Sequence, residues 1–407
     1  MDPMASILAQ RLSRAAGVLL AVAWLSLAGA DPAQANADDD LQQAREAFER
    51  GDRLAGIAAL SRAIDSGELQ PEQLAFALQM RATAYLVTEQ EDQALADASR
   101  LVQLEPDRGR ALLLRAEIEE RKGMADAALA DVDKALADKS LTTRDRVEAN
   151  IVRGTVWGEQ RAEHGRALAA FELALEIDAD SIDARLGRAM ALRGLGRFDE
   201  ALLDFDELVR REPDDTMWRL RRCDVHYLKR DFRRAIEDCD DALARGASTF
   251  VGRTLRGVAN YNLRQLDEAV RDFDVAATGP EQDYELALWH YFALLRAGDA
   301  QRAQTVLDHH AIHGAEPVPR PRWPQAVYQY FIGAVDSAEV QIRALNSHDP
   351  LIRARQTCEA DFYLGEFAAL RGDTAAAKAA LTRAMTDCPA ASEERVAAET
   401  TLAELGN

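Results

Sequence analysis

The chain has 407 residues, of which 48% are hydrophobic but only 6% aromatic, and its formal net charge is -20. The prevalent Ala, Leu, Arg, Asp and Glu residues suit helices and give β-strands little support, so the composition favours an all-α fold. An acidic surface repels phosphate backbones and anionic lipids. This argues against nucleic-acid and general membrane-surface binding and favours protein partners with basic patches.

The first 35 residues have the features of a secretory signal peptide. Arg11 and Arg14 precede an uncharged, mostly apolar run, Ala15 to Ala30, which is followed by the small-x-small pattern Ala33-Gln34-Ala35. The run is shorter than the ~20 residues that a membrane-spanning helix needs. We therefore expect cleavage and a soluble periplasmic protein. The alternative is an uncleaved N-terminal segment that anchors the chain.

Small residues then recur at a fixed spacing. Alanines follow one another in steps of 34 residues, with one step of 39, at Ala94, Ala128, Ala167, Ala201, Ala235, Ala269 and Ala303. A second small residue lies twelve positions before most of them, at Ala82, Ala116, Ala189, Cys223 and Gly257. Only small side chains let two helices cross closely. The pattern therefore predicts one helix pair per period.

The repeating unit resembles the tetratricopeptide repeat, and one of its best matches comprises Ala189, Gly196, Ala201, Phe205 and Pro213. The resemblance covers roughly residues 37 to 405. It implies an all-α, right-handed superhelical solenoid of about nine to ten helix pairs with a C-terminal capping helix over 391–405.

The repeat period divides the chain into four expected segments. These are the signal peptide (1–35), the solenoid (36–308), an excursion rich in Pro and His with a degenerate repeat near Trp323 to Leu345 (309–350), and the terminal repeat with its capping helix (351–407).

An arginine and an aspartate recur sixteen residues apart within the units. The pairs are Arg81 and Asp97, Arg115 and Asp131, Arg188 and Asp204, Arg222 and Asp238, and Arg256 and Asp272. Each Arg falls on the first helix and each Asp on the second, at facing levels of the pair. We interpret them as ion pairs that fix helix register, which add little stability if exposed. The alternative is a basic ladder in the groove.

The cysteines form two pairs, each within one repeat. Cys358 and Cys388 fall at neighbouring ends of an antiparallel helix pair, so a disulfide is expected in an oxidising compartment. Cys223 and Cys239 also face each other, but most helix pairs are too far apart for a disulfide. Two buried thiols are therefore favoured there over a bond. Neither spacing resembles a zinc site.

The resemblance also implies that the first helix of each unit lines a concave groove. Its expected lining residues are Phe76, Gln79, Leu113, Glu117, Leu186, Met190, Leu220, Asp224, Tyr227, Thr254, Val258, Tyr261, Leu288 and Phe292. They are largely apolar with scattered acids, whereas the carboxylate-clamping members of the family carry Lys and Asn there. Binding of a free C-terminal carboxylate is therefore not expected. The groove is predicted to hold protein segments.

Catalytic motifs are absent from the sequence, so we expect neither enzyme activity nor a cofactor or metal. His309, His310 and His313 lie near a helix end before a Pro-rich stretch, and we interpret them as solvated side chains. The alternative function is a cell-wall enzyme or glycan-binding protein. Its candidate carboxylates are Glu117, Glu120, Asp183 and Asp224, and its candidate aromatic platforms are Tyr227, Tyr261 and Phe292.

The last 120 or so residues resemble a more specific group of proteins. The run from Trp289-His290-Tyr291, through Trp323-Pro324, to Phe362-Tyr363-Leu364-Gly365 and Gly372-Asp373 is similar to bacterial envelope lipoproteins of the NlpI type. That likeness implies a periplasmic adaptor that joins envelope proteases to peptidoglycan hydrolases and can form a homodimer. The signal region lacks the lipobox cysteine of that family, so a soluble version is expected.

Overall fold

The computed structural model describes residues 34–104, 109–278, 284–313 and 323–406, and every regular element among them is a helix. The all-α prediction is therefore confirmed for the described chain. Residues 1–33, which hold most of the predicted signal peptide, lie outside it. The chain divides into two compact units, Met1–Ala191 and Leu192–Asn407. The boundary between the units falls within residues 36–308, which were predicted from the repeat period to form a single solenoid.

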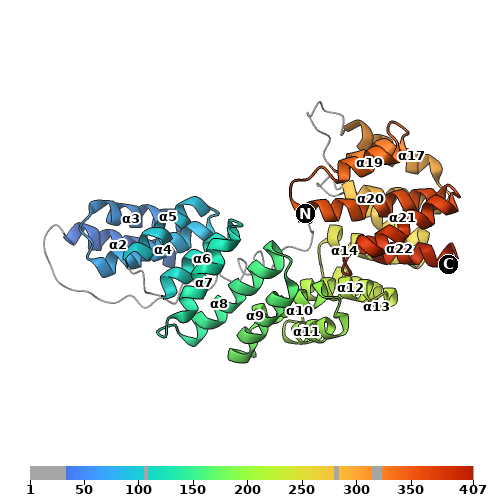
Figure 1. Ribbon diagram of the computed structural model, residues 1–407. Helices are drawn as coiled ribbons and strands as arrows, with labels where there is room; N and C mark the ends of the chain where they lie inside the picture. Colours follow the sequence, from blue (N-terminus) through green and yellow to red (C-terminus); the bar gives the residue numbers. More distant parts are fainter. Residues whose placement is uncertain (1–33, 105–108, 279–283, 314–322, 407) are drawn as a thin grey trace. The chain divides into compact units, whose positions relative to one another are not determined.

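The helices of the first unit pack in consecutive pairs (Figure 1). The first helices of these pairs are α2 (Gln34–Glu49), α4 (Pro71–Val87), α6 (Gly109–Arg121) and α8 (Thr143–Thr155). Their partners are α3 (Arg53–Ser66), α5 (Glu91–Leu104), α7 (Ala125–Ala137) and α9 (His164–Ile177). Helix α10 (Ile182–Gly194) crosses the boundary between the units.

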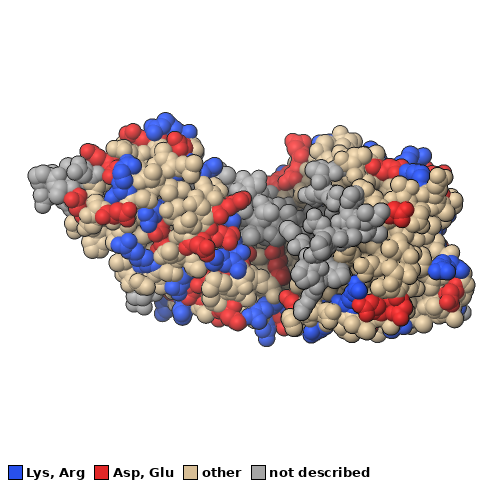
Figure 2. Space-filling view, turned by 90° about the horizontal axis from the view of Figure 1, so that it is seen from above, with Lys and Arg blue, Asp and Glu red and all other residues tan. Residues whose placement is uncertain are grey.

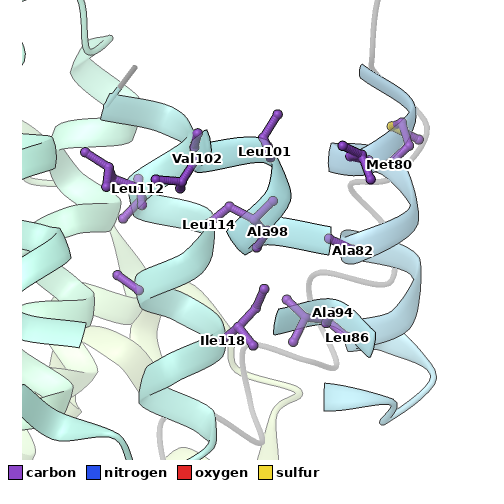
Figure 3. Close-up of a cluster of buried hydrophobic side chains, with 14 of the residues drawn as sticks. Met80, Ala82, Leu86, Ala94, Ala98, Leu101, Val102, Leu112, Leu114 and Ile118 are labelled. Carbon is purple, nitrogen blue, oxygen red and sulfur yellow. The ribbon is translucent and has the colours of Figure 1, made fainter. Parts of the chain in front are cut away.

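Alanines and branched side chains fill the core of the first unit (Figure 3). Ala82 of α4 and Ala94 of α5 are completely buried, as expected for the small residues where paired helices cross. Leu114 and Ile118 of α6 belong to the same continuous core. Each helix pair therefore completes its core against the next pair, as in other repeat proteins.

The 39-residue step contains a π-helical turn. The ring of Phe171 packs on Gly154, where an added Cβ would lie 2.7 Å from the ring. These residues are 17 positions apart, whereas the equivalent Gly257 and Phe273 are 16 apart. The π-helix η1 (Val156–Gln160) lies between Gly154 and Phe171, and its wider turn holds the additional residue.

The turn inside each pair contains one residue with a left-handed backbone. Glycine holds this position at Gly123, Gly196 and Gly298. Other residues hold it, with φ between 53° and 66°, at Glu89, Ala162, Arg230 and Arg264. This conformation costs a residue with a side chain roughly 1–2 kcal/mol. A residue other than glycine at this position therefore either makes a side-chain contact that offsets this cost or lowers the stability of the fold.

The second unit continues the pairing. Its helices are α11 (Phe198–Arg211), α12 (Thr216–Leu228), α13 (Phe232–Ala244), α14 (Thr249–Asn262), α15 (Leu266–Ala276), α16 (Tyr284–Arg296), α17 (Ala300–His313), α18 (Gln325–Phe331), α19 (Ser337–Ala344), α20 (Pro350–Leu370), α21 (Thr374–Asp387) and α22 (Glu393–Glu404). The short helices α18 and α19 occupy the position of the predicted degenerate repeat, and α22 that of the capping helix. No helix of the described residues is long and apolar enough to span a membrane.

Candidate interaction surface

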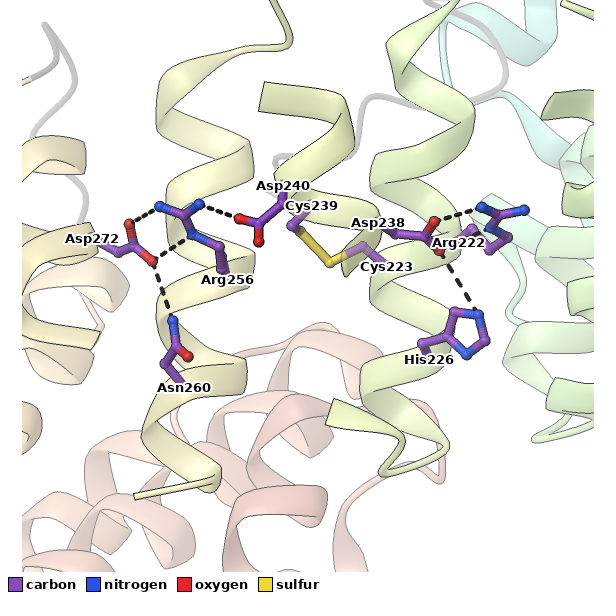
Figure 4. The surroundings of a disulfide bond; sticks show 9 residues. All are labelled: Arg222, Cys223, His226, Asp238, Cys239, Asp240, Arg256, Asn260 and Asp272. Atoms are coloured by element: carbon purple, nitrogen blue, oxygen red, sulfur yellow. Dashed lines mark hydrogen bonds and ion pairs between the residues drawn. A yellow bond between two sulfur atoms is a disulfide. The ribbon is translucent and has the colours of Figure 1, made fainter. Parts of the chain in front are cut away.

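The repeated arginines connect consecutive helix pairs (Figure 4). Arg222 donates to both carboxylate oxygens of Asp238 at 2.8 and 2.5 Å, and to Asp206 of the preceding pair at 2.8 Å. Arg256 repeats this arrangement with Asp272 and Asp240. Because each guanidinium is held by two neighbouring pairs, it fixes the stacking of the repeats as well as the register within one pair.

The structure brings four of the five predicted pairs together, since Arg81 and Arg115 also bond their aspartates at 2.7 and 2.6 Å. The fifth pair, Arg188 and Asp204, is divided between the two units and stays a prediction.

Sequence analysis missed the polar residue one turn after these arginines. His226 lies 3.8 Å from Asp238, and the amide of Asn260 donates to Asp272 at 3.4 Å. Glu119 holds the equivalent place beside Arg115 and is 6% exposed. Burial, followed by the nearby charge of Asp131, raises the pKa of Glu119 to about 7. Each of these polar residues follows its arginine by four positions, so it lies on the same helix face, and this spacing could have identified it from the sequence.

Most of the expected groove residues are buried, so the prediction is wrong for them as outward contacts. These residues are Leu113, Leu186, Leu220, Asp224, Tyr227, Val258, Tyr261, Leu288 and Phe292. Phe76, Gln79, Glu117, Met190 and Thr254 keep partly exposed surface. Packing between successive first helices buries part of the face that was expected to line the groove. The repeat spacing in the sequence does not distinguish these buried residues from exposed groove residues.

In the second unit the chain's own C-terminal helices cover the first-helix face. Helix α22 contacts α12 (Figure 1), and α20 contacts α16. The hydroxyl of Tyr227 on α12 donates to the carbonyl of Glu393 at 3.2 Å. Tyr227, Tyr261 and Phe292 are at most 2% exposed, so they do not form the exposed aromatic platforms that glycan binding would need.

Two of the strained turn residues hold α22 in place. Arg264 donates to both carboxylate oxygens of Glu404 at 2.5 and 2.7 Å, and Arg230 donates to Glu399. These contacts offset the strain of arginine at a position where the backbone favours glycine.

Carboxylates gather where α22 begins. The acidic cluster comprises Glu393 and Glu394 with the carboxylates whose charges act on them, Asp224, Glu285 and Glu359. Burial raises the pKa of Glu394 to about 7, with the charge of Glu359 as a further cause, and it also raises the pKa of Glu393.

Two guanidiniums lie in the cluster. Arg355 donates to Glu285 at 2.7 Å and to Glu359 at 2.6 Å, and Arg193 donates to Asp224 at 2.5 Å. Asp224, which sequence analysis considered as a catalytic carboxylate, is thus part of a buried ion pair.

Both cysteine pairs are joined by disulfides. The Cα atoms lie 4.9 Å apart in Cys358–Cys388 and 5.7 Å apart in Cys223–Cys239. The second bond differs from the expectation of two buried thiols. Cys223 and Cys239 occupy the repeat positions that Gly257 and Phe273 hold in the next pair, where helices approach closely enough for a disulfide.

The histidine segment forms the last turns of helix α17. His309 and His310 lie on α17, and the ring of His310 stacks on Tyr328 at 5.9 Å between centroids. His310 is therefore not simply solvated, because this ring contact half-buries it. The side chain of His313 lies outside the described residues. The described side chains form no group of three or more that could hold a metal ion.

These features define a helical-repeat protein. Residues 80–141 and 186–250 match the family model described as tetratricopeptide repeat, and the chain contains tetratricopeptide repeats in these stretches. The tetratricopeptide-repeat fold implies a protein–protein interaction scaffold.

Known proteins share parts of this architecture. The chain is 29% identical over 149 residues to the mitochondrial import receptor subunit TOM70 of Homo sapiens and of Rattus norvegicus. The match covers 36% of this chain and 24% of each receptor, so the chain spans about a quarter of their length. A tetratricopeptide repeat protein from Parabacteroides merdae has the same fold with a TM-score of 0.52 and 20% identity, over 64% of this chain and 99% of that one.

Proposed function

We propose that this chain is an exported scaffold or adaptor that holds a partner protein segment against the first helices of its first unit. The observation that carries the proposal is that one position of the first helices is partly exposed in the first unit and buried in the second. Phe76, Gln79 and Glu117 of the first unit keep partly exposed surface. Asp224 and Val258, at the repeat position of Glu117, are 2% and 1% exposed in the second unit.

The charge and the cysteines support the rest of the proposal. A net charge of -20 favours a basic partner segment. Two disulfides suit an oxidising compartment such as the periplasm, where the signal-like N-terminus would direct the chain. The likeness of the C-terminal part to envelope adaptors points to envelope proteases or peptidoglycan hydrolases as partners.

Affinity capture tests the interaction. The full chain serves as bait in a native envelope extract at two salt concentrations, beside Phe76→Ala and Glu117→Lys variants. Glu172→Lys, on the exposed surface of α9, is the matched charge control. We expect a reproducible partner whose recovery falls several-fold with the first two variants and stays unchanged with the control. Equal recovery by all baits, or none by the unmodified chain, would refute the proposed binding face.

Cell fractionation tests the location. The chain expressed with its own N-terminus should appear in the periplasmic fraction, and its intact mass should correspond to a protein that begins at Asn36. An intact N-terminus in the membrane fraction would favour the uncleaved anchor. A cytoplasmic protein with free thiols would refute export.

A further inference from the structure

Arginines at the ends of three successive first helices hold the carboxylates of helix α22. Arg230, just after α12, donates to Glu399. Arg264, just after α14, donates to both carboxylate oxygens of Glu404 at 2.5 and 2.7 Å. Arg296, at the end of α16, lies 3.4 Å from Glu404. We call these three arginines the arginine edge, and it presents guanidiniums from three repeats to one acidic helix.

The backbone of the arginine edge is strained in two of these repeats. Arg230 and Arg264 have φ values of 66° and 59°. Glycine holds the same turn position in the neighbouring pairs, at Gly196 and Gly298. A side chain is therefore present at this costly position in the two turns where it bonds a carboxylate of α22.

Helix α22 itself buries little apolar surface. Its buried side chains are Val396, Ala397, Ala398 and Thr401, of which only Val396 is both apolar and larger than alanine. Thr401 donates to Glu366 of α20 at 2.8 Å. Small side chains contribute little hydrophobic stabilisation. The attachment of α22 therefore depends strongly on its polar contacts, and partly exposed ion pairs of this kind are weak.

The chain is anchored immediately before α22. Cys388 follows the last residue of α21 and forms a disulfide with Cys358 of α20. Four residues, 389–392, connect Cys388 to the start of α22. Departure of α22 would therefore leave α20 and α21 joined to each other.

The face beneath α22 contains a polar atom that α22 does not satisfy. The Tyr227 hydroxyl donates to the carbonyl of Glu393 at 3.2 Å and accepts from the amide of Asn262 at 3.0 Å. The side-chain oxygen of Asn262 has no hydrogen-bond partner among the described residues, although Asn262 is buried. Buried polar groups are normally paired. This face therefore has hydrogen-bonding capacity that its present occupant leaves unused.

We propose that the second unit is a docking surface for an acidic amphipathic helix of a partner protein, and that α22 occupies this surface until such a helix displaces it. The partner helix carries small residues on its inner side and carboxylates in place of Glu399 and Glu404, because the arginine edge selects them. The proposal goes beyond the proposed function. It concerns the other unit and a partner of the opposite charge, so either can fail alone.

Peptide exchange tests the proposal. A labelled, capped peptide with the sequence of residues 391–406 serves as the acidic helix, and the full, oxidised chain is titrated into it by fluorescence anisotropy. Glu404→Lys weakens the chain's own α22 without changing the surface beneath it. We expect this variant to bind the peptide roughly 5- to 10-fold more tightly than the unmodified chain, because more of it is open. Glu172→Lys on α9 has the same change of charge at an exposed position and should match the unmodified chain.

Arg264→Glu breaks the same contact from the other side. It also releases Glu404, but it removes the donor that the peptide needs. The original peptide should therefore bind this variant several-fold more weakly than it binds Glu404→Lys. A peptide with the Glu404→Lys change should restore binding to Arg264→Glu, which a misfolded chain would not allow.

Hydrogen exchange locates the bound peptide. In the Glu404→Lys chain, saturating unlabelled peptide should accelerate amide exchange in α22, while α20 and α21 keep their protection. The proposal is overturned by unchanged exchange in α22, by equal peptide affinities of Glu404→Lys and the Glu172→Lys control, or by failure of the charge-reversed peptide to restore binding. A dimer of the unmodified chain that the peptide converts to monomers, measured by light scattering, would assign the surface to α22 of a second copy instead.

Discussion

Arg296 and Glu366 form a buried ion pair across seventy residues of sequence. The Arg296 guanidinium donates to one carboxylate oxygen of Glu366 at 2.8 and 2.5 Å, and Glu366 is completely buried. The hydroxyls of Tyr261 and Thr401 also donate to this carboxylate. One side chain of α20 therefore connects α14, α16 and α22, and it closes the C-terminal helices over the repeats.

Removal of Glu366 should destabilise the second unit. Glu366→Ala leaves Arg296 as a buried charge without its main acceptor, which costs about 3–5 kcal/mol in comparable pairs. Urea unfolding should show this loss. The control is Glu49→Ala, whose partner Arg45 and own side chain are about half exposed, and which should cost under about 1 kcal/mol. Similar small losses for both variants would contradict a structural role for the buried pair.

The left-handed turn residues should respond to glycine according to their contacts. Ala162→Gly removes the strain of a φ of 53° and should stabilise the first unit by roughly 1 kcal/mol. Arg264→Gly removes the same kind of strain but also both bonds to Glu404. We expect faster amide hydrogen exchange in α22 for Arg264→Gly only. Unchanged exchange in α22 would show that the arginine does not hold this helix.

Stability of the first unit should fall with rising pH through Glu119. The folded pKa of about 7 exceeds the ordinary value of 4.5, so folding favours the protonated carboxyl. Its contribution is complete below pH 4.5 and is lost as the pH rises through 7. The free energy of unfolding should therefore fall by up to about 3 kcal/mol between pH 5 and pH 8.

A pH series of urea unfolding curves checks this prediction. Glu119→Gln should remove the pH-dependent component, whereas Glu172→Gln, on an exposed face, should keep it. Curves for Glu119→Gln that run parallel to those of the unmodified chain would assign the pH dependence to other groups.

Two helical glycines should respond in opposite directions to alanine. An added Cβ at Gly257 would lie 2.5 Å from the ring of Phe273, so Gly257→Ala should cost about 1–3 kcal/mol. Gly165 on α9 has no neighbour within 4 Å of an added Cβ, so Gly165→Ala should stabilise by about 0.5–1 kcal/mol. Thermal unfolding compares the two. A neutral Gly257→Ala would mean that the helices separate easily there.

The cysteine pairing predicts specific cross-linked peptides. Digestion of the unreduced protein should yield Cys358 linked to Cys388 and Cys223 linked to Cys239. Reduction should lower stability by roughly 3–4 kcal/mol for the 30-residue separation of the first pair in the chain-entropy model. Alkylation of free Cys358 and Cys388 in the unreduced protein would exclude that bond.

Local relationships were the predictable part of this molecule. The 16-residue spacing of Arg222 and Asp238 places both on one helix pair, and so does the spacing of Cys223 and Cys239. For the cysteines, sequence analysis identified the partners but underestimated how closely the helices approach. The period also leaves room for one further helix pair before Cys358, and the short helices α18 and α19 lie in that stretch.

The sequence by itself determined the helix pairs, their small crossing residues and the register of each pair, because these depend on contacts within about 34 residues. Only the tertiary structure decided which first-helix faces are covered by other helices of the chain. Contacts such as Arg264 with Glu404, 140 residues apart, depend on small rotations that accumulate from repeat to repeat. No spacing in the sequence records that accumulated rotation, so the covering of the second unit by α20 and α22 appears only in three dimensions.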